Sequence, residues 1–121
     1  MSYTVAGNIL TKPTRLTGTG ATPIFEATKR TTIVSILAVE IAGATPALQI
    51  DVYDGASVIG IVNKKAMAAG ESRSLETVIA LQGGWSLRAT AGTANQIDIF
   101  VNYLVADATG QGSQFVPLGQ R

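Results

Sequence analysis

The segment 47–62 limits the fold of this chain more than any other, because it places a tight-turn signal between two strand patterns. Leu48, Ile50 and Val52 recur at every second position, and a period of two is typical of a strand that is buried on one face. Asp54-Gly55 follows directly, and glycine supplies the positive φ that tight hairpin turns require. The segment therefore predicts an antiparallel hairpin.

Two strand faces near this turn carry further expectations. Gln49, Asp51 and Tyr53 form the polar row opposite the apolar one, and we expect them to meet solvent or another subunit. The run 31–42 is almost continuously apolar and begins with β-branched residues, which favours a strand buried on both faces. A helix over 36–41 is the alternative, and the run ends at a turn signal over 43–46.

Short apolar runs separated by turn residues continue along the chain at a spacing of roughly ten residues. Pro13 cannot donate a ladder hydrogen bond and indicates a strand boundary. No helical pattern alternates with the runs, which argues against a parallel α/β sheet. We therefore predict an all-β fold, an antiparallel β-sandwich (jelly-roll or immunoglobulin-like) of about seven to nine short strands. Further strands are expected at 14–19, 24–28, 57–62, 74–81, 85–89 and 96–105.

The chain of 121 residues is expected to form one domain with an extended arm. Residues 1–105 are assigned to the sandwich, and residues 1–13 within them are a possible N-terminal edge strand or arm. The polar, Gly-containing stretch 107–114 has the composition of a flexible linker. Residues 106–121 are therefore predicted to be a flexible C-terminal arm.

The composition argues against several functional classes. Charged residues make up only 14% and the net charge is +1, with two isolated basic doublets, so we expect no nucleic-acid partner. The chain has no cysteine and no histidine, which removes thiol chemistry and the commonest general base and metal ligand. No secretory signal is evident and no apolar run is long enough for a spanning helix, so we expect no membrane partner.

The acidic residues do not form a catalytic or metal-binding pattern. Asp51 and Asp54 lack the spacing of a calcium loop, and Asp54 is better explained as a turn former. Nothing brings two carboxylates together as a glycosidase requires, and no serine or threonine has an evident base beside it. We therefore expect no enzymatic activity, no catalytic residue, no metal, no cofactor and no small-molecule substrate.

The aromatic residues leave one alternative function open. Trp85 with Tyr3, Tyr53 and Tyr103 would form a sugar-stacking platform if they shared one face, as in β-sandwich carbohydrate-binding modules. A single tryptophan after Gly83-Gly84 is more often a core or corner residue. A carbohydrate-binding module is thus the alternative to a structural role.

The two ends of the chain carry the candidate interface residues. Phe115, Val116, Pro117 and Leu118 form an apolar cluster beyond the polar linker. Such a cluster needs a surface on which to be buried, because ordering the linker costs about 1–2 kcal/mol per residue. A frayed end or a tail folded back on its own domain is one interpretation, and an arm docked on a neighbouring subunit is the other. At the opposite end, Tyr3 and Val5 are the matching candidates.

Three motifs follow one another in a recognisable order. The sequence Ala68-Ala-Gly-Glu-Ser72 precedes a strand, Gly83-Gly-Trp-Ser-Leu87 begins the next, and the alternating strand 97–103 closes the domain. This order resembles that of the small all-β structural proteins of tailed bacteriophages, and the resemblance covers residues 24–105. It implies a virion component of head-decoration or head–tail/tail-associated type. The motifs consist of turn residues, so the resemblance carries over no functional residue.

The resemblance implies a non-enzymatic virion structural protein that forms homo-oligomers and binds the capsid or the head–tail or tail shell. A decoration or cement role is favoured, with other virion proteins as further partners. The expected location is the virion, after synthesis in the host bacterial cytoplasm. The low charge agrees with this class, because isolated soluble domains usually carry more charged residues than this chain.

Overall fold

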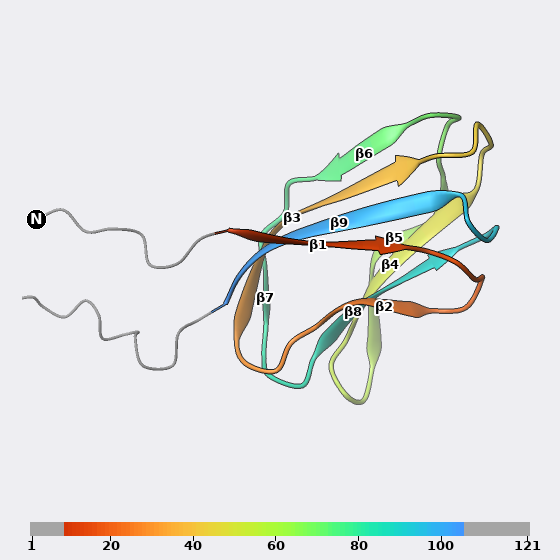
Figure 1. Ribbon diagram of the computed structural model, residues 1–121. Helices are drawn as coiled ribbons and strands as arrows, with labels where there is room; N and C mark the ends of the chain where they lie inside the picture. Colours follow the sequence, from red (N-terminus) through yellow and green to blue (C-terminus); the bar gives the residue numbers. More distant parts are fainter. Residues whose placement is uncertain (1–8, 106–121) are drawn as a thin grey trace, which may run out of the picture.

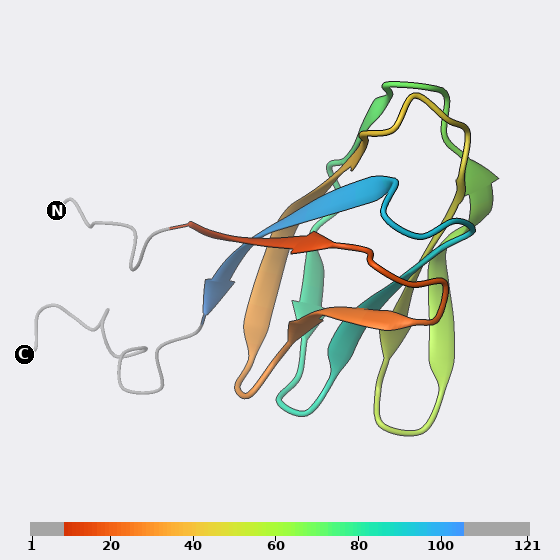
Figure 2. The same ribbon diagram turned by 45° about the vertical axis from the view of Figure 1, so that its right-hand side comes forward.

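A computed structural model describes residues 9–105 of the chain, which form nine β-strands and no helix (Figure 1). The strands are β1 (Leu10–Arg15), β2 (Thr22–Glu26), β3 (Thr31–Glu40), β4 (Ala47–Tyr53), β5 (Val58–Ala66), β6 (Ser72–Leu75), β7 (Ile79–Leu81), β8 (Ser86–Ala91) and β9 (Ile97–Val105). They form two antiparallel sheets that pack face to face (Figure 2). The predicted all-β antiparallel sandwich is confirmed.

The order of the strands identifies the kind of sandwich. Sheet A has the order β1-β9-β3-β6, and β7 also pairs with β3, so that β6 and β7 share one edge position. Sheet B has the order β2-β8-β4-β5. The chain crosses repeatedly between the sheets, and the last strand lies beside the first. This is the arrangement of a jelly roll. In an immunoglobulin sandwich the first two strands share a sheet, whereas β1 and β2 lie in different sheets here.

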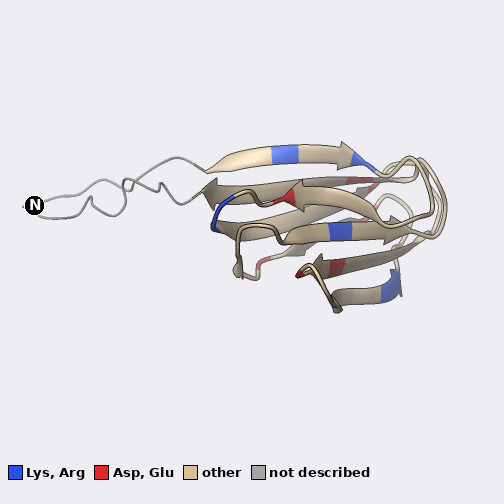
Figure 3. Cartoon of the chain, turned by 90° about the horizontal axis from the view of Figure 1, so that it is seen from below, with Lys and Arg blue, Asp and Glu red and all other residues tan. Residues whose placement is uncertain are grey.

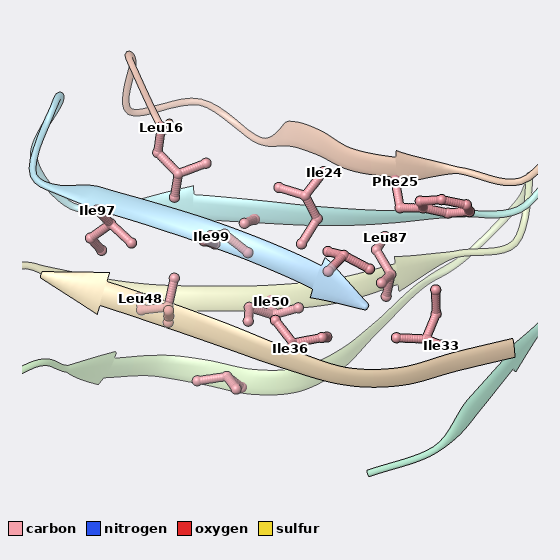
Figure 4. Packing of buried hydrophobic residues seen from close by; sticks show 14 of the residues in the cluster. Leu16, Ile24, Phe25, Ile33, Ile36, Leu48, Ile50, Leu87, Ile97 and Ile99 are labelled. Carbon is pink, nitrogen blue, oxygen red and sulfur yellow. The ribbon is translucent and has the colours of Figure 1, made fainter. Parts of the chain in front are cut away.

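The core between the sheets consists mainly of branched aliphatic side chains (Figure 4). Ile36 and Ile99 from sheet A and Ile50 and Leu87 from sheet B are almost fully shielded from solvent. Burying one such side chain contributes about 1.5–3 kcal/mol, so this layer is the main source of stability. Other fully buried large side chains are Leu16, Ile24, Ile33, Leu48, Met67, Leu81, Ile97 and Val101.

The central hairpin forms as the sequence predicts. β4 has the expected bounds, and Asp54 accepts hydrogen bonds from the backbone N–H groups of Ala56 (2.9 Å) and Ser57 (2.7 Å). Gly55 has φ of 98°, a backbone region that favours glycine. The run that begins at Thr31 is a strand, so the helix alternative is wrong. Its inner face is buried, while its outer face is only partly covered by the chain itself.

Several boundaries differ from the sequence-based expectation. β1 spans Leu10–Arg15 and not 14–19, and β5 continues to Ala66, beyond the expected end at 62. Pro13 lies inside β1 and not at a boundary, which is possible because β1 is an edge strand and does not need every N–H. The single strand expected over 74–81 is divided into β6 and β7. The break lies level with a register shift between Ile33 and Ser35 of β3, where the regular ladder is interrupted.

Glu40, at the end of β3, joins two loops that are distant in sequence. Its carboxylate is buried and accepts backbone N–H groups from Gly70 (2.7 Å), Ala42 (2.9 Å), Gly43 (2.9 Å) and Ala44 (3.1 Å). These hydrogen bonds lower the pKa of Glu40, and the bond from Gly70 has the largest effect. Burial alone would raise this pKa, but its effect is smaller than that of the hydrogen bonds together. The ionised carboxylate therefore holds the β3–β4 loop against the β5–β6 connection.

This geometry predicts an acid-sensitive contribution from Glu40. Because its folded-state pKa lies below the ordinary value of 4.5, the stabilisation is complete above that pH and is lost as the pH falls through the folded-state pKa. We expect Glu40→Gln to melt at a lower temperature than wild type near neutral pH. In acid the wild-type carboxylate becomes protonated and loses this stabilisation, so the two melting temperatures are expected to approach each other. Thermal unfolding between about pH 3 and pH 7 measures this. Glu26→Gln, at an exposed carboxylate on β2, is the control. A deficit of Glu40→Gln that stays equal at every pH contradicts the assignment.

Candidate interaction surfaces

The structure describes residues 9–105, so the interface residues predicted at the two ends lie outside the described range. These residues are Tyr3, Val5, Phe115, Val116, Pro117 and Leu118. The assignment of 106–121 as an arm concerns the same undescribed part of the chain. Surfaces for interaction must therefore be sought on the sandwich itself.

The outer face of sheet A has an apolar centre. Pro13, Phe100 and Leu37 lie side by side on β1, β9 and β3. Val39 lies on the same face in the next row, and Leu104 lies two rows away on the other side, beyond Asn102. Pro13, Phe100 and Leu37 are in direct register with one another. None of the five side chains is fully buried by the chain. Only a few positions along the strands carry the colours of charged residues in Figure 3. The centre of this face therefore presents exposed apolar surface, beside the ion pair of Arg15 with Asp98.

The polar groups on this outer face are bonded mainly to one another. Thr11 donates to Asn102 Oδ1 (2.6 Å), and Asn102 donates to Ser35 Oγ (2.9 Å) across β1, β9 and β3. Arg15 forms two hydrogen bonds to the Asp98 carboxylate, at 2.7 and 3.0 Å. This pairing lowers the pKa of Asp98 and raises the pKa of Arg15. Because these partners lie within the face, burying it leaves few polar groups without a hydrogen bond.

Exposed apolar side chains continue around the margin of sheet A. Ile9 and Leu10 stand at the start of β1, Val105 at the end of β9, and Val78 in the link between β6 and β7. The exposed fractions are 58% for Ile9, 42% for Val105 and 66% for Val78. β1 begins and β9 ends at the same side of the sandwich, so the chain enters and leaves beside this apolar margin (Figure 1). We call the outer face of sheet A with this margin the apolar face.

The outer face of sheet B is polar, and several of its side chains contact one another, although Arg88 Nε is buried without a hydrogen-bond partner among the described residues. Asp51 is only 5% exposed and accepts a hydrogen bond from Gln49 Nε2 (2.9 Å). Arg88 stacks on the Tyr53 ring at 3.9 Å, a cation–π contact. The expectation that the row from Gln49 to Tyr53 meets solvent or a partner is wrong for Asp51. Asp51 lies on β4, which is paired on both sides, level with Arg88 of β8 and Gly60 of β5, and Gln49 binds its carboxylate.

An open cleft of about 630 Å³ lies between β5 and β6, at the edge where the two sheets separate. Lys64, Lys65 and Arg73 lie along it, and Arg73 donates to Glu71 (2.9 Å) and to the Ala66 carbonyl (2.8 Å). The backbone N–H of Ala68 and the Arg73 side chain lower the pKa of Glu71. Arg73 is thereby held in place by groups of this loop, which gives it a structural role.

The described aromatic side chains do not share a face. Tyr53 lies on the outer face of sheet B, whereas Trp85 packs against the core from the other side. Tyr103 also packs inward, with its ring centroid 4.5 Å from that of Phe25. Within the described range, no sugar-stacking platform is formed by these residues.

The described residues contain no group of three or more acidic side chains that is placed to hold a metal ion. The acidic residues that stand out have structural partners: Glu40 and Asp54 hold loops, and Asp98 binds Arg15. In residues 9–105 no helix is long and apolar enough to span a membrane.

Comparison with known proteins gives a match of fold. No family profile matches the chain, and no curated protein matches it. Two solved structures, each described as a pentameric capsid protein isolated from metagenomic phage sequences, are similar to it. The first has a TM-score of 0.50 at 18% identity and is matched over 91% of this chain and 76% of its own. The second has a TM-score of 0.50 at 17% identity, over 91% and 67%. At these identities the likeness establishes the fold alone.

The position of Trp85 predicts how its fluorescence responds to sugars. Because its ring packs against the core, we expect oligosaccharides to leave its intensity and emission maximum unchanged. A titration with soluble oligosaccharides measures this, and unfolding in denaturant serves as the positive control, since it exposes the ring. Saturable quenching by one sugar contradicts this placement and favours the carbohydrate-binding alternative.

Proposed function

We propose that this protein is a non-enzymatic structural component of a bacteriophage virion that works as a homo-oligomer. The observation that supports the proposal is the apolar face, whose polar groups are mainly paired with one another. Oligomerisation buries such a face without leaving many unsatisfied polar groups, so assembly costs little in lost hydrogen bonds. The contrast with the polar outer face of sheet B gives the subunit one side for contact and one side for solvent.

The comparisons support the same class. Both similar structures are described as pentameric capsid proteins of phage origin. A closed ring of identical subunits uses two different patches on each copy, and the apolar face is a candidate for one of them. We propose a pentamer as the assembly, and a decoration or cement role on the capsid shell as its place in the virion.

The terminal segments belong to the same proposal. The chain enters at Ile9 and leaves after Val105 beside the apolar face. We propose that Phe115 to Leu118, and Tyr3 with Val5, bind a neighbouring subunit or the shell close to that face. The polar linker after Val105 allows this cluster to reach past its own domain, since each extended residue spans roughly 3.3 Å.

A charge placed in the centre of the apolar face is expected to prevent assembly. In Leu37→Lys the ammonium group is buried at the contact without a partner, which costs about 3–5 kcal/mol. That corresponds to a dissociation constant raised roughly 100- to 3,000-fold. Light scattering coupled to gel filtration measures the mass, and the variant is expected to run as the 12.5 kDa monomer.

Thr90→Lys is the matched control, because Thr90 is a half-buried residue on the outer face of sheet B. It is expected to keep the mass of wild type, and melting curves establish that both variants are folded. A monomeric wild type, or a folded Leu37→Lys variant that assembles normally, contradicts the proposed role of the apolar face.

The terminal cluster is tested by replacing Phe115, Val116 and Leu118 with serine, which keeps the length of the chain. We expect an unchanged melting temperature and binding to subunits or to particles that is at least about tenfold weaker, since one buried aromatic side chain contributes about 1.5–3 kcal/mol. Co-sedimentation with particles and the mass in solution measure this. Serine substitutions at Gln111 and Gln114 in the linker are the control, and equal binding of both variants contradicts the proposal.

A further inference from the structure

The two sheets approach each other at one side of the sandwich and separate at the other. At the first side the edge strands β1 and β2 lie close together. At the other side β5 is the edge of sheet B and β6 lies at an edge of sheet A, and both strands line the open cleft of about 630 Å³. This cleft is therefore bounded by two edge strands that belong to different sheets.

The register of β5 determines which of its side chains face the cleft. Residues directly opposite each other in an antiparallel pair lie on the same face of the sheet. Val62 lies opposite Ile50, which is fully buried in the core. Lys65 lies opposite Leu48, which is also fully buried. Val62 and Lys65 are thus on the inward face of sheet B, at its open edge.

The register of β6 gives the opposite wall. Arg73 lies opposite Ala38 of β3, and Leu75 lies opposite Ile36, and both of these β3 residues are buried. Arg73 and Leu75 are therefore on the inward face of sheet A. Each wall of the cleft thus has one apolar side chain and one cation.

The cations of the two walls lie at the same end of the cleft, next to the loop that joins β5 to β6. Arg73 Nη2 donates to the carbonyl of Ala66, the last residue of β5, at 2.8 Å. Lys65 precedes Ala66 and contributes to the lowered pKa of Glu71 in the loop. The cleft therefore has a cationic end at Lys65 and Arg73 and an apolar end at Val62 and Leu75.

The described chain does not balance the positive charge of this end. Glu71 accepts hydrogen bonds from Arg73 Nε (2.9 Å) and Nη2 (3.2 Å). Within residues 9–105, neither Lys64 nor Lys65 forms an ion pair. Arg73 Nη1 is buried and has no hydrogen-bond partner in the same range. Since a buried donor without an acceptor costs free energy, this end of the cleft favours an additional negatively charged acceptor.

We propose that this cleft binds an extended acidic segment of another protein. A carboxylate of the segment lies at Lys65 and Arg73, and an apolar side chain lies between Val62 and Leu75. Arg73 and Leu75 are two positions apart on β6, and side chains two positions apart share one face of an extended chain. The bound segment therefore carries its apolar and its acidic residue two positions apart.

The lining of the cleft favours a peptide over a nucleic acid. A phosphate backbone offers charge but no apolar group for Val62 and Leu75, whereas a peptide offers both on one face. Single-stranded nucleic acids bind by stacking their bases on aromatic side chains, and no aromatic residue lines the described cleft. The two edge strands also offer backbone N–H and C=O groups to an extended chain.

Two blocked peptides of equal composition test the proposed spacing. In Thr-Val-Thr-Glu-Thr the valine and the glutamate share one face of an extended chain, whereas in Thr-Val-Glu-Thr-Thr they lie on opposite faces. An NMR titration of the full chain measures binding through the amide signals of 61–66 and 72–75. We expect the first peptide to shift these signals and to bind at least about fivefold more tightly than the second, which buries only one of its two groups.

The two basic doublets of the chain supply a matched pair of variants. Lys64→Ala with Lys65→Ala is expected to weaken binding of the first peptide at least about threefold, because two charge pairs are lost. Lys29→Ala with Arg30→Ala, in the β2–β3 loop, removes the same charge elsewhere and is expected to leave binding unchanged. Melting curves establish that both variants are folded.

Selective binding of the first peptide that depends on Lys64 and Lys65 supports the proposal. Equal binding of the two peptides, equal binding by the two variants, or no shift at the cleft overturns it. Sodium phosphate or hexathymidylate that shifts the same signals as strongly overturns the choice of a peptide. The apolar face is intact in both variants, so failure here is distinguishable from failure of the proposed assembly.

Discussion

The mutual burial of the inner faces of the two sheets is the interaction on which the rest of the structure depends. Every long strand contributes alternate side chains to this layer, and the sequence has few other sources of stability, since charged residues are scarce and cysteine is lacking. The jelly-roll order follows from this demand, because a chain that crosses between sheets closes both of them over one core. Interactions with other molecules therefore depend on the outer faces and edges of the two sheets.

Outside the core, the molecule has two unlike faces and four strand edges. The apolar face of sheet A keeps its few polar groups paired internally, whereas the outer face of sheet B holds a buried carboxylate and an arginine stacked on tyrosine. Among the edges of the described sandwich, β5 and β6 line an open cleft with Lys65 and Arg73 on its two walls. A subunit with one apolar face and one cationic cleft has two separate means of contact.

Much of the fold is predictable from local pattern. The period of two and the Asp-Gly turn predict β4 and its hairpin with correct bounds, because both depend on neighbours in sequence. Other features depend on contacts across the fold and have no local signal. Glu40 is bonded to Gly70, thirty residues away in the chain, and Asp51, in the row expected to be exposed, is buried on β4, which is paired on both sides. The break between β6 and β7 reflects a register shift in another strand.

The apolar face had a partial signal, since Phe100 and Leu104 place apolar residues on the second face of the closing strand. Its extent was not predictable, because it requires knowing that β1 and β3 flank β9. Hydroxyl-radical footprinting of the assembled protein tests the central claim most directly, by comparing the reactivity of Phe100 with that of Tyr53. The account predicts that assembly protects Phe100 and leaves Tyr53 unchanged relative to the monomer. Protection of Tyr53 with Phe100 unchanged contradicts it.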